Sequence, residues 1–163
     1  MNAKLLLPAL ILLGICSMNI LVKAQMTEMA MNHIMLNVSD IKYGPAPPGL
    51  PAGAMAAVIE GDPSKPGLHT IRAKMPGGYQ IMPHTHPTDE HVTVLEGSCY
   101  MGLGPTFDQS TATKLTMGGF CELNAGTVHY FFTKEACVIQ LHGTGPWDIN
   151  YIDPKNDPRN MKK

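Results

Sequence analysis

Charge is scarce in this sequence and is not concentrated anywhere. Charged residues make up 15% of the 163 residues, with 12 Lys and Arg against 13 Asp and Glu, and no run of basic residues occurs. A protein that binds nucleic acid usually carries a basic patch or stripe. The even charge balance therefore predicts that nucleic acid is not a partner of this chain.

Several motifs of common enzyme classes are also missing. The chain has no P-loop, no G-x-G-x-x-G fingerprint after a strand and no G-x-S-x-G nucleophile elbow. Its cysteines form no C-x-x-C pair, which argues against a thioredoxin-like site and an all-cysteine zinc site. No motif for an organic cofactor is therefore present.

Long amphipathic helices are the third absence. The 16 Gly and 14 Pro residues divide the chain into short apolar runs separated by turn signals, a pattern typical of an antiparallel sandwich or small barrel. We expect seven strands, at Leu68–Lys74, Tyr79–His86, Glu90–Glu96, Ser98–Leu103, Gly119–Leu123, Thr127–Phe132 and Ala136–His142. We expect the polar stretch Gly104–Thr116 to be a long hairpin loop.

The first 24 residues have the features of a secretory signal peptide. Lys4 precedes the apolar run Leu5–Ile15, and Val22 and Ala24 are small residues suited to a cleavage site. The run is short for a membrane-spanning helix, which needs about 20 apolar residues. We therefore expect a periplasmic or secreted protein with no stable membrane anchor after cleavage; an uncleaved anchor is the alternative.

After this segment the chain divides into three predicted parts. They are a Met- and Pro-rich N-terminal arm at 25–57, a barrel at 58–147 and a polar C-terminal tail at 148–163. The arm holds a cluster of soft donors, namely Met26, Met29, Met31, His33 and Met35. Thioethers select Cu(I), but methionine also fills apolar contacts. We favour an arm that packs on the barrel or on a second subunit.

Loss of the signal peptide would leave Cys99, Cys121 and Cys137. An odd number of cysteines in an exported protein leaves at least one thiol without an intramolecular partner. A Cys121–Cys137 disulfide is one interpretation. The interpretation that we favour is three small, buried hydrophobic residues.

Four possible metal ligands lie in a compact pattern. Side chains alternate along a strand, so His84 and His86 share one face, and Glu90 opens the next predicted strand. His129 lies on a strand in the second half of the barrel. Three imidazole nitrogens and one carboxylate oxygen suit one divalent ion of Fe, Mn, Ni, Cu or Zn, with one or two positions open.

These residues resemble the two motifs of the cupin superfamily. The first motif, G-x5-H-x-H-x3,4-E-x6-G, reads here Gly78-YQIMP-His84-Thr85-His86-PTD-Glu90-HVTVLE-Gly97. The second, G-x5-P-x-G-x2-H-x3-N, reads Gly118-GFCEL-Asn124-Ala125-Gly126-TV-His129-YFF-Thr133 and departs from the family at Asn124 and Thr133. The resemblance implies an all-β cupin barrel (double-stranded β-helix or jelly roll) with an extended N-terminal arm. Because cupin barrels often pair, it also implies a homodimer.

The remaining candidates concern the pocket beside the metal. Residues that can form its walls are Tyr79, Met82, Phe131, Gln140, His142 and Trp147. Gln140 and His142 belong to one face of their strand, which either lines this pocket or faces solvent. His91 follows Glu90 and is expected on the opposite face. His33 and His69 lie outside both motifs and are interpreted as surface or strand residues.

Three functions fit this pattern. The first is a metal-dependent enzyme, of the dioxygenase type, that acts on a small organic molecule and uses Glu90 as a catalytic base. The second is a non-catalytic periplasmic module that binds a metal or small molecule, such as a sensor. The third is an interaction scaffold in which the metal is incidental. We favour the enzyme, although fold analogy cannot choose the reaction.

Overall fold

The structure, a computed structural model, describes residues 33–161. The chain divides into two units, residues 1–37 and 38–163, and every described strand belongs to the second. The predicted signal peptide and Met26, Met29 and Met31 lie outside the described residues, whereas His33 and Met35 are described and exposed. Between residues 33 and 161 no helix is long and apolar enough to cross a membrane.

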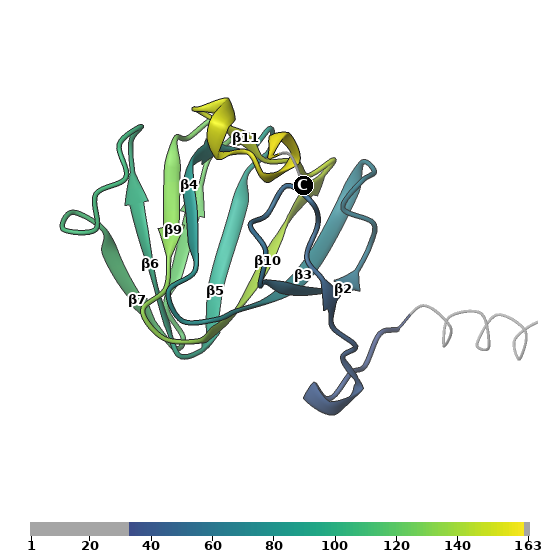
Figure 1. The fold of residues 1–163 in the computed structure, drawn as a ribbon. Helices are drawn as coiled ribbons and strands as arrows, with labels where there is room; N and C mark the ends of the chain where they lie inside the picture. Colours follow the sequence, from purple (N-terminus) through teal and green to yellow (C-terminus); the bar gives the residue numbers. More distant parts are fainter. Residues whose placement is uncertain (1–32, 162–163) are drawn as a thin grey trace, which may run out of the picture. The chain divides into compact units, whose positions relative to one another are not determined.

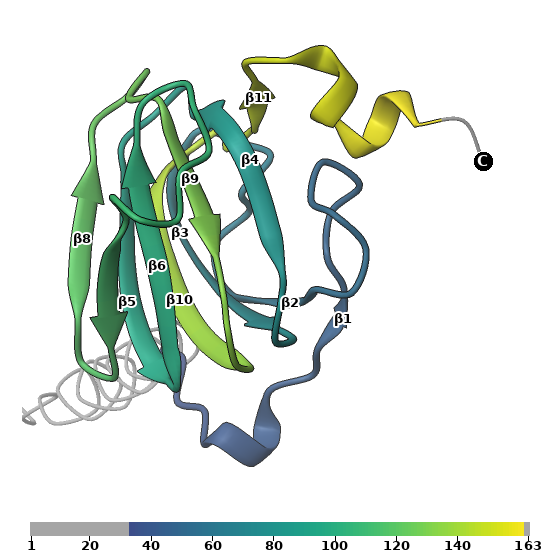
Figure 2. The ribbon, with the colours of Figure 1, turned by 60° about the vertical axis from the view of Figure 1, so that its left-hand side comes forward.

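The second unit consists of two antiparallel sheets that face each other (Figures 1 and 2). One sheet has the order β1-β2-β3-β10-β5-β8 and the other β11-β4-β9-β6-β7. The strands are β1 Gly44–Pro45, β2 Met55–Glu60, β3 Gly67–Met75, β4 Gln80–Thr85, β5 Glu90–Glu96, β6 Ser98–Leu103, β7 Thr113–Thr116, β8 Phe120–Leu123, β9 His129–Phe132, β10 Cys137–Gly145 and β11 Asn150–Tyr151. Short 3-10 helices lie at Val38–Asp40, Pro154–Asn156 and Pro158–Asn160. The predicted all-β barrel is confirmed.

All seven predicted strands are present, as β3, β4, β5, β6, β8, β9 and β10. The prediction of one long loop at Gly104–Thr116 is wrong at its end, because β7 occupies Thr113–Thr116 and pairs with β6. In this strand only Leu115 is apolar and partly buried. A single apolar residue among polar ones gives no alternation that sequence analysis can detect.

The sheets extend beyond both predicted ends of the barrel. β1 and the first half of β2 come from the segment interpreted as an arm, and β2 pairs with β3. β11 comes from the predicted tail and pairs with β4. Strands of two residues take their stability from the neighbour that they pair with, so their own sequence carries no periodic signal.

Glycine closes the tight turns around the first motif. Gly97 joins β5 to β6 with a φ of 70°, a conformation that side-chain-bearing residues rarely adopt. A Cβ at this position would also collide with the carbonyl oxygen of Ala136. The motif segment from Glu90 to Gly97 thus ends where the chain must reverse direction into the other sheet.

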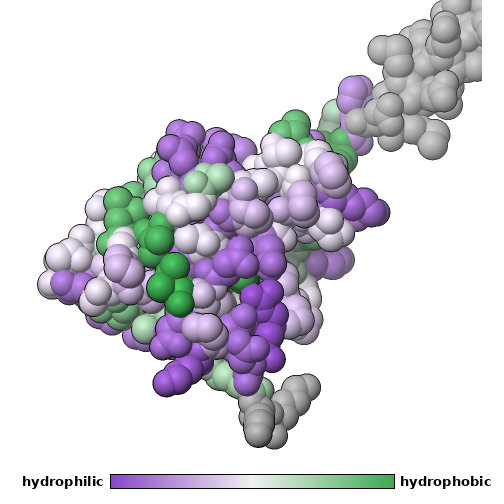
Figure 3. Space-filling view, turned by 90° about the horizontal axis from the view of Figure 1, so that it is seen from above, coloured by the Kyte–Doolittle hydropathy of each residue, from purple (hydrophilic) through white to green (hydrophobic). Residues whose placement is uncertain are grey.

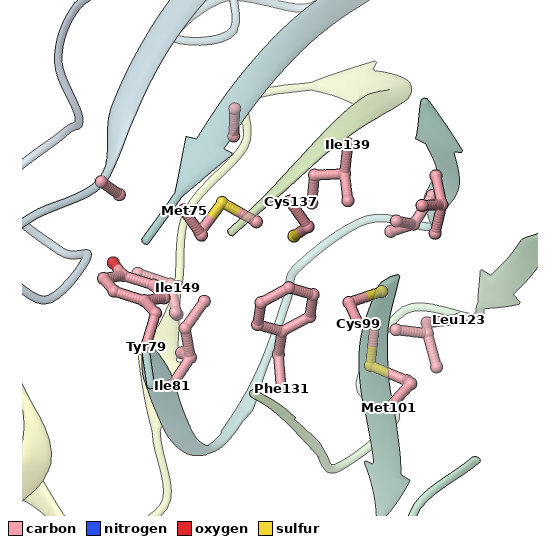
Figure 4. Packing of buried hydrophobic residues seen from close by; sticks show 14 residues of the cluster. Met75, Tyr79, Ile81, Cys99, Met101, Leu123, Phe131, Cys137, Ile139 and Ile149 are labelled. Carbon is pink, nitrogen blue, oxygen red and sulfur yellow. The ribbon is translucent and has the colours of Figure 1, made fainter. Parts of the chain in front are cut away.

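The core lies between the two sheets, and Phe131 lies near its middle (Figure 4). Phe131 on β9 pairs with Ile81 on β4 and Met101 on β6, so its ring lies between side chains of the two neighbouring strands. Cys99 and Cys137 belong to the same cluster, and Cys121 packs against it. All three thiols are free; Cys99 and Cys137 are buried, as we favoured, whereas Cys121 is only partly buried. Burial raises the pKa of Cys99 to about 12 and those of Cys121 and Cys137 to about 11, so none is a thiolate near neutral pH.

Candidate metal centre

Three histidines meet inside the barrel at the end where β11 lies. His84 is on β4, His86 directly follows that strand, and His129 opens β9 opposite His84 in the strand register. Their ring centroids are 4.1 Å (His84–His129), 4.9 Å (His84–His86) and 5.2 Å (His86–His129) apart. Each residue is at most 5% exposed, and one ligand atom from each lies within 4.8 Å of the others. This buried triad can hold a metal ion.

Backbone carbonyl groups fix the proton on each imidazole ring. Nδ1 of His84 lies 2.8 Å from the Met82 carbonyl oxygen, and Nδ1 of His129 lies 3.0 Å from that of Thr127. Nδ1 of His86 lies 2.6 Å from the carbonyl oxygen of Asp148. A carbonyl oxygen only accepts, so each Nδ1 must carry the hydrogen and each Nε2 keeps its lone pair. The second ring nitrogen of a metal-binding histidine usually has such a partner.

Burial also keeps the rings of His84 and His129 neutral. Loss of hydration lowers the pKa of His84 to about 2, and the neighbouring histidines add to the shift. Burial likewise lowers the pKa of His129. Metal ions bind the neutral imidazole, so the site already has its binding-competent form near neutral pH.

Glu90 approaches the triad from the other sheet. It opens β5, and its carboxylate oxygens lie 3.4 Å from Nε2 of His86 and 3.8 Å from Nε2 of His129. Ligand atoms about 2.1 Å from a shared tetrahedral metal lie about 3.4 Å apart. The indole N–H of Trp147 donates to Oε1 of Glu90 at 3.3 Å, and the Trp147 ring stacks on His86. The structure therefore brings the three predicted histidine ligands together, and Glu90 lies beside two of them.

Two loops hold the strand ends that carry the triad. The amide of Gly126 donates to the carbonyl oxygen of His86 at 2.9 Å, and the amide of Ala125 donates to the Asp89 carboxylate at 2.7 Å. At the departure from the cupin motif, Thr133 is buried; its hydroxyl donates to the Pro76 carbonyl oxygen and accepts from the Tyr79 amide. Thr133 thus ties β9 to the turn before β4.

The triad opens into an internal cavity of about 60 Å³. Because one water molecule needs about 10–15 Å³, the cavity has room for several. Its wall is almost entirely apolar apart from His84, His86, Glu90 and His129. Of the predicted wall residues, Tyr79, Phe131 and Trp147 line it. The end of the barrel above this cavity is mostly hydrophilic at its surface, with smaller hydrophobic patches (Figure 3).

Met82, Gln140 and His142 do not line the cavity, so these predictions are wrong. On β10 the inward positions are Ile139 and Leu141, which line the cavity. Gln140 instead accepts a hydrogen bond from Arg72 at 3.0 Å, and His142 is exposed beside His91. Both alternatives were open for Gln140 and His142 because the more polar face of a strand can line a polar pocket or face solvent. Met82 lies in an irregular stretch of β4 between Ile81 and His84, where simple alternation fails.

Three cavity residues come from segments that gave no signal in the sequence. Pro47 and Leu50 lie in the Pro-rich loop between β1 and β2, and Ile149 precedes β11. Hydroxyl groups hold this loop in place, because Tyr79 donates to the Pro51 carbonyl oxygen at 2.7 Å and Tyr151 to that of Gly49 at 2.9 Å.

His69 is not the surface residue that one interpretation allowed. It lies on β3, is 2% exposed, and its Nδ1 has no hydrogen-bond partner among the described residues. In the strand register it lies opposite Gly143, which in turn lies opposite Glu90. Burial lowers the pKa of His69, and the Glu90 carboxylate opposes the shift. His91, by contrast, lies on the outer face as predicted.

Comparisons with known proteins agree with this architecture. Residues 26–150 match a family described as a domain of unknown function (DUF4437), and a search of curated proteins found no match. Among solved structures, the polyketide cyclase RemF from Streptomyces resistomycificus is 19% identical, with 76% of this chain and 88% of that chain covered and a TM-score of 0.63.

Two further structures show the same fold. A proposed acetylacetone dioxygenase from Methylibium petroleiphilum PM1 is 15% identical, covering 78% of this chain and 85% of that one, with a TM-score of 0.59. An RmlC-like cupin from Shewanella frigidimarina NCIMB 400 is 11% identical, covering 69% and 91%, with a TM-score of 0.54. Its barrel has the fold of these cupin structures, and the protein belongs to the DUF4437 family.

Proposed function

We propose that this protein is an exported cupin that binds one divalent metal through His84, His86, Glu90 and His129 and acts as a dioxygenase-type enzyme on a small organic molecule. The observation that carries the proposal is that the backbone already holds all three histidine rings in the tautomer that binds a metal. Three buried imidazoles each have Nδ1 tied to a backbone carbonyl group, which leaves three Nε2 lone pairs beside one carboxylate. Without a metal, burying this set of polar groups would be costly.

The donor set fits Fe, Mn, Ni, Cu or Zn, since these borderline ions accept imidazole nitrogen together with carboxylate oxygen. When bound, a redox-active ion of this group would supply the activation of O2. The protein's own residues then do three things: the triad holds the ion, the apolar wall excludes water, and Glu90, as a weakly held ligand that leaves the ion, accepts a proton. Glu90 suits this last role because Trp147 holds its Oε1 in place.

The cavity limits the substrate. With walls such as Tyr79, Phe131 and Ile139, it favours a small and largely apolar molecule with one chelating end. An enol, a catechol or a carboxylate would present oxygen atoms to the metal and carbon to the walls. The likeness to a proposed acetylacetone dioxygenase is consistent with this class, although at 15% identity it supports only the fold.

A non-catalytic binding or sensor module is the second candidate, and the depth of the site favours it. All four proposed ligands are at most 5% exposed. An ion held by all four would have little contact with solvent, as expected for a closed site rather than an open one.

Metal analysis followed by O2 uptake tests the proposal. The protein would be loaded with Fe, Mn, Ni or Cu in turn and supplied with a panel of enols and catechols. Turnover with one metal, lost in Glu90→Gln, supports the enzyme. A stoichiometric metal whose spectrum shows no open coordination position would refute it in favour of the binding module.

Export and a homodimer complete the proposal, and both rest on the sequence. Export is supported by the signal-like features of residues 1–24, and the dimer by the resemblance to cupins. Fractionation of the native host and light scattering of the purified protein test them.

A further inference from the structure

A polar row crosses the outer face of the six-stranded sheet. Glu60, Thr70, His142, His91 and Glu122 are successive partners on β2, β3, β10, β5 and β8. The four inner strands of this sheet can be followed side by side in Figure 1, and β8 beside β5 in Figure 2. Residues at one level of neighbouring strands share a face. The row is therefore on the side of the sheet away from the cavity.

Two histidines lie together in the middle of this row. The ring centroids of His91 and His142 are 4.8 Å apart. Nε2 of His91 is 4.0 Å from Oε1 of Glu122, whose side chain is about half exposed. Across residues 33–161 neither ring forms a hydrogen bond to a backbone group, unlike the three rings of the inner triad. Their nitrogens are thus free to bind a ligand.

A hollow of about 400 Å³ adjoins the pair and is lined by His91, His142, Asp89 and Thr144, among others. Thr88 also lines it, and its hydroxyl oxygen is buried with no hydrogen-bond partner in the described part of the chain. The hollow offers space for the water molecules that would complete a coordination shell.

We propose that His91, His142 and Glu122 form a second metal site, on the outer face of the barrel, for a borderline divalent cation such as Zn²⁺ or Cu²⁺. Two imidazoles and a carboxylate, with water in the open position, are a donor set that zinc accepts. Donors of a tetrahedral zinc lie about 3.3 Å apart, whereas Nε2 of His91 and Oε1 of Glu122 are 4.0 Å apart and the three outer donors are not yet gathered as closely as those of the inner triad. Binding would therefore require rotation of the half-exposed Glu122, the partly exposed His91 and the exposed His142 toward one another.

The site is separate from the inner triad. Side chains alternate along β5, so Glu90 faces the cavity while its neighbour His91 faces outward. His142 has no ligand of the inner site next to it in the sequence. His142→Gln is therefore the variant that removes an outer ligand with the least disturbance of Glu90.

Calorimetric titration of the metal-free full chain with Zn²⁺ tests the inference. The wild type is expected to bind two equivalents, and His142→Gln one. His84→Ala is expected to lose the inner equivalent and keep the outer one. The two proposals therefore fail differently. If the wild type and His84→Ala each bind one equivalent and His142→Gln binds none, only the proposal of the inner site is wrong.

Two charge-matched variants sharpen the result. Glu122→Gln should weaken the outer equivalent, whereas Glu60→Gln, at the far end of the row and bonded to Thr70, should leave it unchanged. Circular dichroism confirms that each variant folds. The inference is overturned if His142→Gln and His91→Gln both retain every equivalent that the wild type binds.

Discussion

The indole of Trp147 is the one side chain that holds the Glu90 carboxylate by a hydrogen bond, within residues 33–161. The change Trp147→Phe removes the N–H donor and keeps an aromatic ring to stack on His86, where the centroids are 5.2 Å apart. It isolates the hydrogen bond from the packing.

The expected loss follows from the geometry. A hydrogen bond to a charged acceptor contributes about 1.5–3 kcal/mol, and the 3.3 Å length places this one at the lower end. A loss of about 1.4 kcal/mol corresponds to a tenfold loss of affinity. Removing a group that is hydrogen-bonded to a metal ligand typically lowers metal affinity by about 10–100-fold, so this value is at the lower end. Trp147→Phe should therefore weaken inner metal binding about tenfold.

Competition with a chelator near neutral pH measures this affinity. In a Glu90→Gln background the same Trp147→Phe change should add almost nothing, because the carboxylate that it positions is already gone. His91→Gln serves as a control that leaves the inner affinity unchanged. An affinity of Trp147→Phe within about twofold of the wild type would refute the reasoning that Trp147 positions a metal ligand.

The remaining predictions concern stability and thiol chemistry. Thr133→Val leaves the buried Tyr79 amide without a partner and removes the hydrogen bond to the Pro76 carbonyl group, so unfolding in urea should show a loss of about 1–3 kcal/mol that Thr133→Ser largely avoids. The thiols of Cys99 and Cys137 should react with a maleimide only after denaturation, because both are buried and their pKa values are raised; rapid labelling of the folded protein would contradict this. The metal-free protein should lose stability as the pH falls below about 6.5, because His84 and His129 bind protons in the unfolded chain but not in the folded protein, where their pKa values are lowered. The free energy of unfolding should fall by up to about 1.4 kcal/mol per pH unit for each histidine. Equal denaturation midpoints at neutral and mildly acidic pH would contradict this prediction.

The sequence predicted the long strands and the four clustered residues because both follow local rules. Alternation along β4 places His84 and His86 on one face, and the turn glycine at Gly97 brings the chain back. Glu90 and His129 were predicted as further ligands from their spacing in the two motifs. The resemblance to the cupin motifs therefore identified the polar residues of the cavity wall.

The apolar walls could not be predicted in the same way. Pro47, Leu50 and Ile149 reach the cavity from segments without periodicity, and tertiary contacts such as the Tyr79 hydrogen bond to Pro51 hold them there. Such contacts between distant segments leave no local pattern. His69 differs from these three, because alternation along the predicted strand β3 places it on the buried face with Ile71 and Ala73.

The most direct test of the inner site is the metal content of the protein purified from its native compartment and dialysed against a weak chelator. The account predicts one tightly bound equivalent of a borderline divalent metal in the wild type and almost none in His129→Ala, with both proteins folded. A wild type that neither carries nor takes up metal, or a His129→Ala variant that retains it, would contradict the central claim.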